Sequence, residues 1–180
     1  YDKILQFHSK SAVMRGNEFK PFLDQGLPET AMRDLSNFAN FSVEYNGKIY
    51  PTVEHAFQSQ KYLYATYSEP KPKKTKKNEM IATTQKESIE DIMNRFTVDG
   101  ELTALQAKTE GGRKTMEERG YTLDISKWAI NSVPLMQELI QSKIERNLEI
   151  KQILNILKQF NVQLAHFSRS DMKWGCHVSE

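Results

Sequence analysis

A hairpin signal that runs directly into a helix signal constrains the fold most. Residues 41–50 contain two short β-prone runs around Asn46-Gly47, and both residues of this dipeptide favour the positive φ angles of a two-residue hairpin turn. Thr52 follows the hairpin as a suitable N-cap for a helix, which we expect to extend to about Tyr67. The sequence therefore predicts a β-hairpin joined at once to a helix.

The remaining periodic segments predict a chain rich in helix with few strands. Residues 3–8 and 162–167 alternate apolar and polar side chains, which is typical of short strands, whereas residues 15–30 read as loop. Apolar residues at helical spacing predict further helices, with Pro134 in the first turn of one of them. These helices are expected at 84–96, 101–108, 113–119, 132–144 and 148–160. With 180 residues, this pattern predicts one α+β domain over 1–180, helix-rich with a small β-sheet or hairpin.

Composition excludes several classes of protein. Hydrophobic residues make up 38% and charged residues 27%, which is typical of a folded globular chain and not of a disordered one. The net charge of +2 predicts no strong non-specific binding of nucleic acid by the chain as a whole. No apolar run reaches membrane-spanning length and no signal-peptide pattern is present, so we expect an intracellular, cytoplasmic protein, or a nuclear one in a eukaryote. The single cysteine excludes an internal disulfide, and no spacing predicts a metal site or a cofactor.

The segment at about 69–78 concentrates positive charge. Its sequence EPKPKKTKK holds two prolines and five lysines, which cannot pack into a core, so we expect an exposed loop. Such a loop could contact a nucleic-acid backbone, although a solvated loop of no such role explains the same composition.

Three polar side chains share one face of the helix that follows the hairpin. Glu54, Gln58 and Lys61 recur at i, i+4 and i+7 and span roughly 10 Å. Glu54 lies in the first turn, where the helix dipole favours the ionised carboxylate by about 0.3–1 kcal/mol. An ionised carboxylate there could stabilise an oxocarbenium-like sugar or activate a water, and Lys61 could bind a phosphate or form an imine with an opened sugar. The competing interpretation is an ordinary solvated surface pair.

Several different short motifs follow one another along the chain. The most specific are Ser36-Asn37-Phe38 and the run PTVEHAFQSQKYL at 51–63. Weaker elements follow at Ala107-Lys108, Gly112-Arg113, Lys127-Trp128, 133–136 and 170–175. In this order they resemble the NADAR (YbiA-like) superfamily of N-glycosidases. The chain departs from the family pattern in ending soon after Trp174-Gly175, in the lysine-rich insertion, and in carrying Tyr50 where some members carry tryptophan.

The resemblance implies an enzyme that cleaves a base–ribose C–N bond. Two activities are associated with the family: removal of ADP-ribose from modified guanine in nucleic acid, and cleavage of a phosphorylated ribosylaminopyrimidine intermediate of riboflavin synthesis. We expect the first, because the lysine-rich segment and residues 107–120 look more like the ADP-ribose-directed branch. The alternatives of other classes are a non-catalytic module that reads ADP-ribose or NAD, and a helical scaffold.

The resemblance and the residue chemistry together give a set of expected site residues. Asp171 could assist Glu54 or bind ribose hydroxyls, Arg113 could clamp a phosphate, and either tryptophan could stack on a base or pack in the core. The expected catalytic residues are Glu54, Lys61 and Asp171. The expected substrate-binding residues are Ser36, Asn37, Phe38, Gln58, Arg113, Trp128, Trp174 and Gly175. The expected partners are a substrate that contains ADP-ribose or a phosphoribosyl group, and nucleic acid carrying modified guanine, with the oligomeric state left open.

Overall fold

The computed structural model of the chain describes residues 3–69 and 86–166. Within these ranges the protein mixes helices with short strands, so the predicted α+β class is confirmed, and the strands form three separate pairs instead of one sheet. Contacts divide the chain into two compact units. We call residues 1–41 with 143–180 the terminal unit, and residues 42–142 the central unit. The single domain over 1–180 stays a prediction, as does the exposed loop at 69–78, which lies almost wholly outside the described residues.

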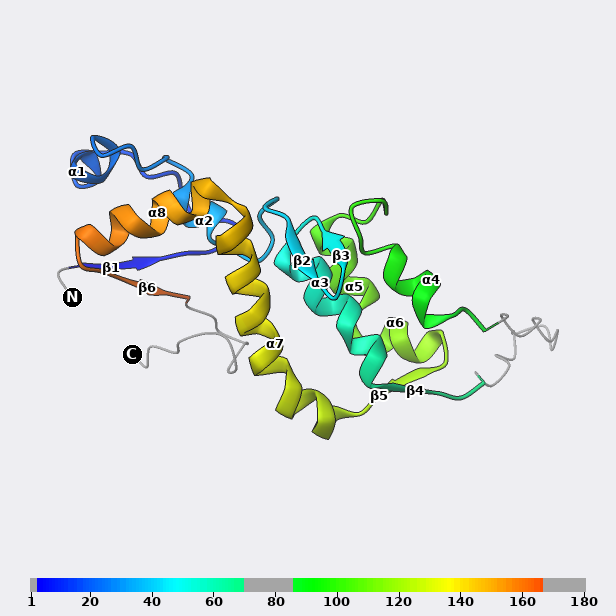
Figure 1. The fold of residues 1–180 in the computed structure, drawn as a ribbon. Coiled ribbons are helices and arrows are strands. Elements are labelled where there is room, and N and C mark those ends of the chain that lie inside the picture. Colours follow the sequence, from blue (N-terminus) through cyan, green and yellow to red (C-terminus); the bar gives the residue numbers. More distant parts are fainter. Residues whose placement is uncertain (1–2, 70–85, 167–180) are drawn as a thin grey trace, which may run out of the picture. The chain divides into compact units, whose positions relative to one another are not determined.

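A parallel strand pair and one amphipathic helix build the core of the terminal unit. Strand β1 (Lys3–Gln6) pairs with β6 (Val162–Ala165), in the two segments whose alternation predicted strands. Helix α8 (Leu148–Gln159) lies along this pair (Figure 1), and its apolar face is buried because the spacing follows the helical repeat. The buried residues of that face are Ile150, Ile153 and Leu157.

Two short helices complete this core, and one of them corrects the sequence analysis. Helix α1 (Lys20–Leu23) lies inside the stretch expected to be loop, and α2 (Ala31–Asp34) follows it. The expectation of an uninterrupted loop is wrong because Phe22 is buried against Phe160, with the ring centroids 4.6 Å apart, and this anchor orders the turn around it.

A buried ammonium holds the end of α2. Lys143 is only 3% exposed, and its Nζ donates to the carbonyl oxygens of Asp34 at 2.6 Å and Ser36 at 2.8 Å. These carbonyls lie at a helix C-terminus, where partial negative charge favours a cation. Burial nevertheless lowers the pKa of Lys143 to about 8, with the Asp34 carboxylate opposing the shift. The ammonium therefore fixes the start of the Ser36-Asn37-Phe38 segment while remaining poorly solvated itself.

The central unit begins with the predicted hairpin. Strand β2 (Val43–Tyr45) pairs antiparallel with β3 (Lys48–Tyr50), and the turn residues Asn46 and Gly47 have φ angles of 50° and 74°. Helix α3 (Val53–Gln60) follows directly, and the Thr52 side chain accepts a hydrogen bond from the His55 amide as its N-cap. All eight residues of α3 are buried, so this helix is the centre of the unit.

The expected end of this helix at Tyr67 is wrong. The α-helical part stops at Gln60, a 3-10 turn covers Lys61–Tyr64, and strand β4 (Ala65–Tyr67) follows. Strand β4 pairs antiparallel with β5 (Tyr121–Leu123), which the sequence analysis did not predict. Pairing with a distant segment overrides local helical periodicity here, and a search for periodicity along the chain cannot detect that partner.

The other predicted helices are present with shifted ends. Their bounds are α4 (Ile89–Asn94), α5 (Ala104–Glu110), α6 (Arg113–Glu118) and α7 (Ile125–Arg146). Helix α5 carries a capping box, in which the Thr103 and Gln106 side chains each accept a hydrogen bond from the other's backbone amide. Pro134 lies inside α7 and not in its first turn, so that expectation is wrong. Pro134 and Ile130, the residue four positions before it, are both exposed. No helix in the described ranges is both long enough and apolar enough to cross a bilayer.

The Lys143→Met variant tests the buried ammonium through the pH dependence of stability. The pKa of Lys143 is about 8 in the folded protein against 10.5 for an ordinary lysine, so between these values the unfolded chain binds more protons. The free energy of unfolding should therefore rise with pH across this window, by roughly 3 kcal/mol. Urea unfolding from pH 7.5 to 10.5 should show this rise in the wild type and a flatter curve in the variant. Parallel curves for the two proteins would show that Lys143 does not have the lowered pKa.

Candidate functional site

Glu54 and Gln58 form a hydrogen-bonded pair on one face of α3. Glu54 is 7% exposed, and the Gln58 Nε2 donates to its Oε1 at 2.8 Å. The i, i+4 spacing places these side chains one turn apart on the same face, as predicted. The Gln58 Oε1 is buried and accepts no hydrogen bond from the described residues. Gln58 therefore orients the Glu54 carboxylate and keeps one acceptor unused within the fold.

Lys61 joins this pair from the 3-10 turn that follows α3. Its side chain is half-buried, and its Nζ donates to the Gly111 carbonyl oxygen at 3.0 Å. Burial lowers the pKa of Lys61, the Glu54 carboxylate raises it, and Lys108 lowers it. The two candidate catalytic groups thus interact electrostatically, as their spacing predicted, although Lys61 lies in a tighter turn than the expected α-helix.

An aromatic wall borders the lysine. The Trp128 ring from α7 lies 4.9 Å from Phe57 and 5.6 Å from Tyr64, measured between centroids. The Lys61 Nζ is 5.9 Å from the centroid of the Trp128 ring, within the range of a cation–π contact. Trp128 is half-buried, so it packs between other rings and also forms one side of the site.

Gly111 brings the end of α5 against α3. A Cβ at this position would lie 2.4 Å from the Gln58 Oε1 and 2.6 Å from its Cβ. The φ angle of Gly111 is −86°, which any residue adopts, so the requirement for glycine is steric and not conformational. The same residue supports Gln58 and supplies the carbonyl that binds Lys61.

His55 fixes the start of α3. Its Nε2 donates to the Leu102 carbonyl oxygen at 2.7 Å, and its Nδ1 lies 2.8 Å from the Thr52 hydroxyl. Burial lowers the pKa of His55, and the bond to Leu102 opposes the shift. With both ring nitrogens engaged by the protein, His55 supports the start of α3.

The other expected site residues lie on other segments of the chain. Arg113 starts α6, and its exposed side chain pairs with Glu117 at 2.7 Å. Ser36 is buried just after α2 in the terminal unit, and Asn37 and Phe38 follow it half-buried. Asp171, Trp174 and Gly175 lie outside the described residues.

Sequence reasoning missed two contributors to the site. It named Gly112-Arg113 only as a weak motif that contains a candidate phosphate-binding arginine, and it assigned Gly111 and Tyr64 no role. The Gly-Gly pair was the available signal, because close approach of another segment is one of the reasons for glycine at a helix end. Nothing local marked Tyr64, whose contact with Trp128 depends on the path of α7.

Two variants should move the pKa of Lys61 in opposite directions. Glu54→Gln removes the carboxylate that raises this pKa, so the pKa should fall, whereas Lys108→Gln removes a repelling charge, so it should rise. Titration of the protein with selectively ¹³Cε-labelled lysine, followed by NMR, measures both shifts. An unchanged Lys61 pKa in the two variants would show that the three charges do not form one site.

Gly111→Ala should destabilise the central unit by roughly 1–3 kcal/mol, because the added methyl group overlaps the Gln58 side chain. Thr109→Ala is the matched control at an exposed position of α5 and should change stability by less than about 0.5 kcal/mol. Urea unfolding compares the two. Equal effects would mean that the end of α5 has room to move away from α3.

Comparisons with known proteins show what the chain is similar to. No protein-family model matches the chain. The chain is 50% identical over 36 residues to N-glycosidase YbiA of Escherichia coli (strain K12) and of Shigella boydii serotype 4; the match covers 20% of this chain and 22% of those relatives. The matched part thus spans about a fifth of their length.

A solved structure extends the likeness to nearly the whole chain. The NMR structure of the E. coli protein YbiA matches with a TM-score of 0.56 at 20% identity, covering 97% of this chain and 72% of that one. A structural match at this low sequence identity shows a shared fold. The resemblance to the YbiA-like superfamily that the motifs predicted is therefore confirmed: the chain has the fold of YbiA and shares with N-glycosidase YbiA a short segment of closely similar sequence.

Proposed function

We propose that the chain is an N-glycosidase that hydrolyses a base–ribose C–N bond. The observation that carries the proposal is the buried Glu54 carboxylate in electrostatic contact with the partly desolvated amine of Lys61, beside the Trp128 ring. The segment shared with N-glycosidase YbiA supports the same activity.

Glu54 suits the charge that develops when a glycosidic bond breaks. Loss of the base leaves positive charge on the sugar, and a fixed carboxylate stabilises such a transition state or activates the attacking water. Because Gln58 donates to the carboxylate, Glu54 is held in one orientation before substrate binds. A group oriented in advance needs little rearrangement during the reaction, which is the basis of electrostatic catalysis.

Lys61 has two roles open to it, and they differ in protonation. A lowered pKa increases the fraction of neutral amine, which can attack the carbonyl carbon of an opened sugar and form an imine with loss of water. As an ammonium, Lys61 would instead bind a phosphate of the substrate. Trapping of the imine separates the two roles.

For the substrate we propose ADP-ribosylated guanine in nucleic acid. The lysine-rich sequence at 69–78 supports this choice, because local positive charge favours a polyanionic substrate. Asp171 would act as a second carboxylate, and Ser36, Asn37, Phe38, Arg113, Trp174 and Gly175 would contact the substrate. A phosphorylated ribosylaminopyrimidine is the alternative substrate, and a non-catalytic reader of ADP-ribose is the alternative function.

Incubation with an oligonucleotide carrying ADP-ribosylated guanine tests the proposal. The wild type should release free ADP-ribose, and Glu54→Gln should reduce the rate by at least about a hundredfold, because the neutral amide cannot stabilise the sugar cation. Release is quantified by liquid chromatography, with the ribosylaminopyrimidine phosphate assayed in parallel. Binding of the oligonucleotide without turnover would support the reader, and turnover of the pyrimidine alone would reassign the substrate.

Borohydride reduction during turnover tests the imine. The wild type should gain the mass of the reduced sugar adduct at Lys61, and Lys61→Met should gain none, because only a primary amine forms the imine. Intact-protein and peptide mass spectrometry locate the adduct. Turnover by the wild type with no adduct would assign Lys61 to phosphate binding.

A further inference from the structure

Two neighbouring residues of the 3-10 turn bind two neighbouring carbonyls at the end of α5. The Lys61 Nζ donates to the Gly111 oxygen at 3.0 Å, and the Tyr62 hydroxyl donates to the Glu110 oxygen at 2.7 Å. The last carbonyls of a helix have no partner inside it and carry partial negative charge, so they attract both donors. The place of the Lys61 amine therefore depends on where the end of α5 lies.

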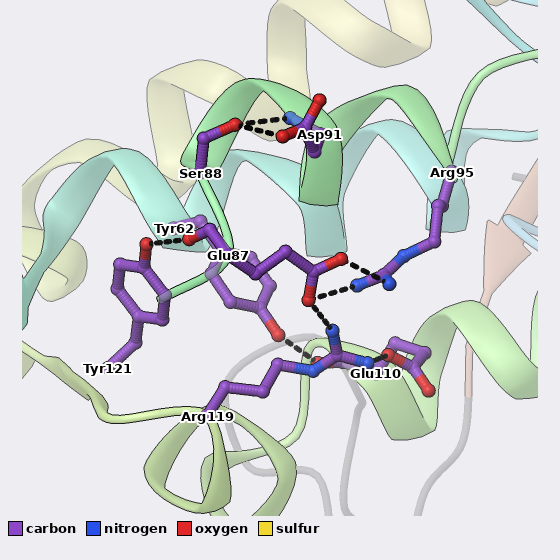
Figure 2. Close-up of polar contacts among 8 residues, drawn as sticks. All are labelled: Tyr62, Glu87, Ser88, Asp91, Arg95, Glu110, Arg119 and Tyr121. Carbon is purple, nitrogen blue, oxygen red and sulfur yellow. Dashed lines mark hydrogen bonds and ion pairs between the residues drawn. The ribbon is translucent and has the colours of Figure 1, made fainter. Parts of the chain in front are cut away.

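An ion network around Arg119 fixes the end of α5. The Arg119 guanidinium, at the end of α6, pairs with the Glu110 carboxylate through one nitrogen and with Glu87 at 2.6 Å through another (Figure 2). Glu87 also pairs with Arg95 at 2.5 Å, after α4. A planar guanidinium can bridge two carboxylates in this way, which a lysine cannot do with the same geometry.

The network is sheltered enough to constrain its members. The side chains of Arg119, Glu110 and Glu87 are 22%, 25% and 33% exposed, so salt screens them less than a fully exposed pair. Tyr121 donates to the Glu87 carbonyl oxygen at 2.6 Å, which ties the segment before α4 to β5. Burial raises the pKa of Tyr62 to about 12, so its hydroxyl remains a donor to Glu110 throughout the physiological range.

We propose that Arg119 is a positioning residue for Lys61. It acts through Glu110: the ion pair holds the last turn of α5, and the Gly111 carbonyl then holds the Lys61 amine within the field of Glu54. The ion pairs of Arg119 are with Glu87 and Glu110, and neither carboxylate is assigned to chemistry. The proposal deepens the proposed function, since positioning matters to turnover only if Lys61 acts on the substrate.

The proposal differs from a purely structural role in what it predicts for the amine. An ammonium released from the Gly111 carbonyl cannot stay buried without an acceptor, because an unsatisfied buried charge is strongly unfavourable. It would instead turn toward water and lose the desolvation that is the largest cause of its lowered pKa. Loss of Arg119 should therefore raise the Lys61 pKa, whereas a general loss of stability would leave it unchanged in the folded protein.

Arg119→Gln in the full chain is the test, with Arg15→Gln as the matched control. Arg15 also forms an ion pair, with Glu29 at 2.9 Å, but it is highly exposed and belongs to the terminal unit. NMR titration with ¹³Cε-labelled lysine should show a higher Lys61 pKa in Arg119→Gln and no change in Arg15→Gln. On the oligonucleotide substrate, kcat should fall roughly ten- to a hundredfold in Arg119→Gln with a smaller change in KM, because misplacement of a reacting group acts mainly on the chemical step.

Each outcome decides the question. A folded Arg119→Gln protein with an unchanged Lys61 pKa would overturn the proposal, whatever its melting temperature. If this variant does not fold, Glu110→Gln replaces it, since the amide keeps the shape of the side chain and loses its charge; it should raise the Lys61 pKa by a smaller amount, and no shift there would equally overturn the proposal. Absence of turnover by the wild type would remove the proposed function but leave the pKa comparison valid, so the two claims fail separately.

Discussion

The contact between the end of α5 and the turn that follows α3 is the constraint on which the central unit depends. Gly111 lies so close to Gln58 that an added Cβ would overlap its side chain, and the Gly111 carbonyl oxygen accepts a hydrogen bond from the Lys61 ammonium. Gly111 therefore contacts both Gln58, whose amide orients Glu54, and the amine of Lys61. Close approach of two backbones, made possible by a missing Cβ, is a common way for a fold to bring polar groups together in a small space.

This arrangement explains why a buried carboxylate and a lysine are compatible here. Burial disfavours the charged form of Lys61, and the Glu54 carboxylate offsets part of that penalty. The Gly111 carbonyl oxygen and the Trp128 ring both contact the Lys61 ammonium and stabilise its charge. Groups with perturbed protonation are frequent where proteins perform chemistry.

The sequence predicted the local features well and the non-local ones poorly. The Asn46-Gly47 turn and the Thr52 cap were readable because their signals lie within a few residues, and so was the shared face of Glu54 and Gln58. The pairing of β4 with β5 was not, because it shortens a helix through a contact with a distant segment. The role of Gly111 escaped for the same reason: its neighbour in space, Gln58, is far away in the sequence.

A structure of the protein with ADP-ribose bound would show whether Glu54 and Lys61 act on one sugar. The account predicts that the anomeric carbon of the terminal ribose lies roughly 3–3.5 Å from a Glu54 carboxylate oxygen, the separation expected of reacting groups, with the Lys61 amine on the same sugar or its phosphate. A ribose bound elsewhere, with Glu54 and Lys61 contacting only protein, would contradict it.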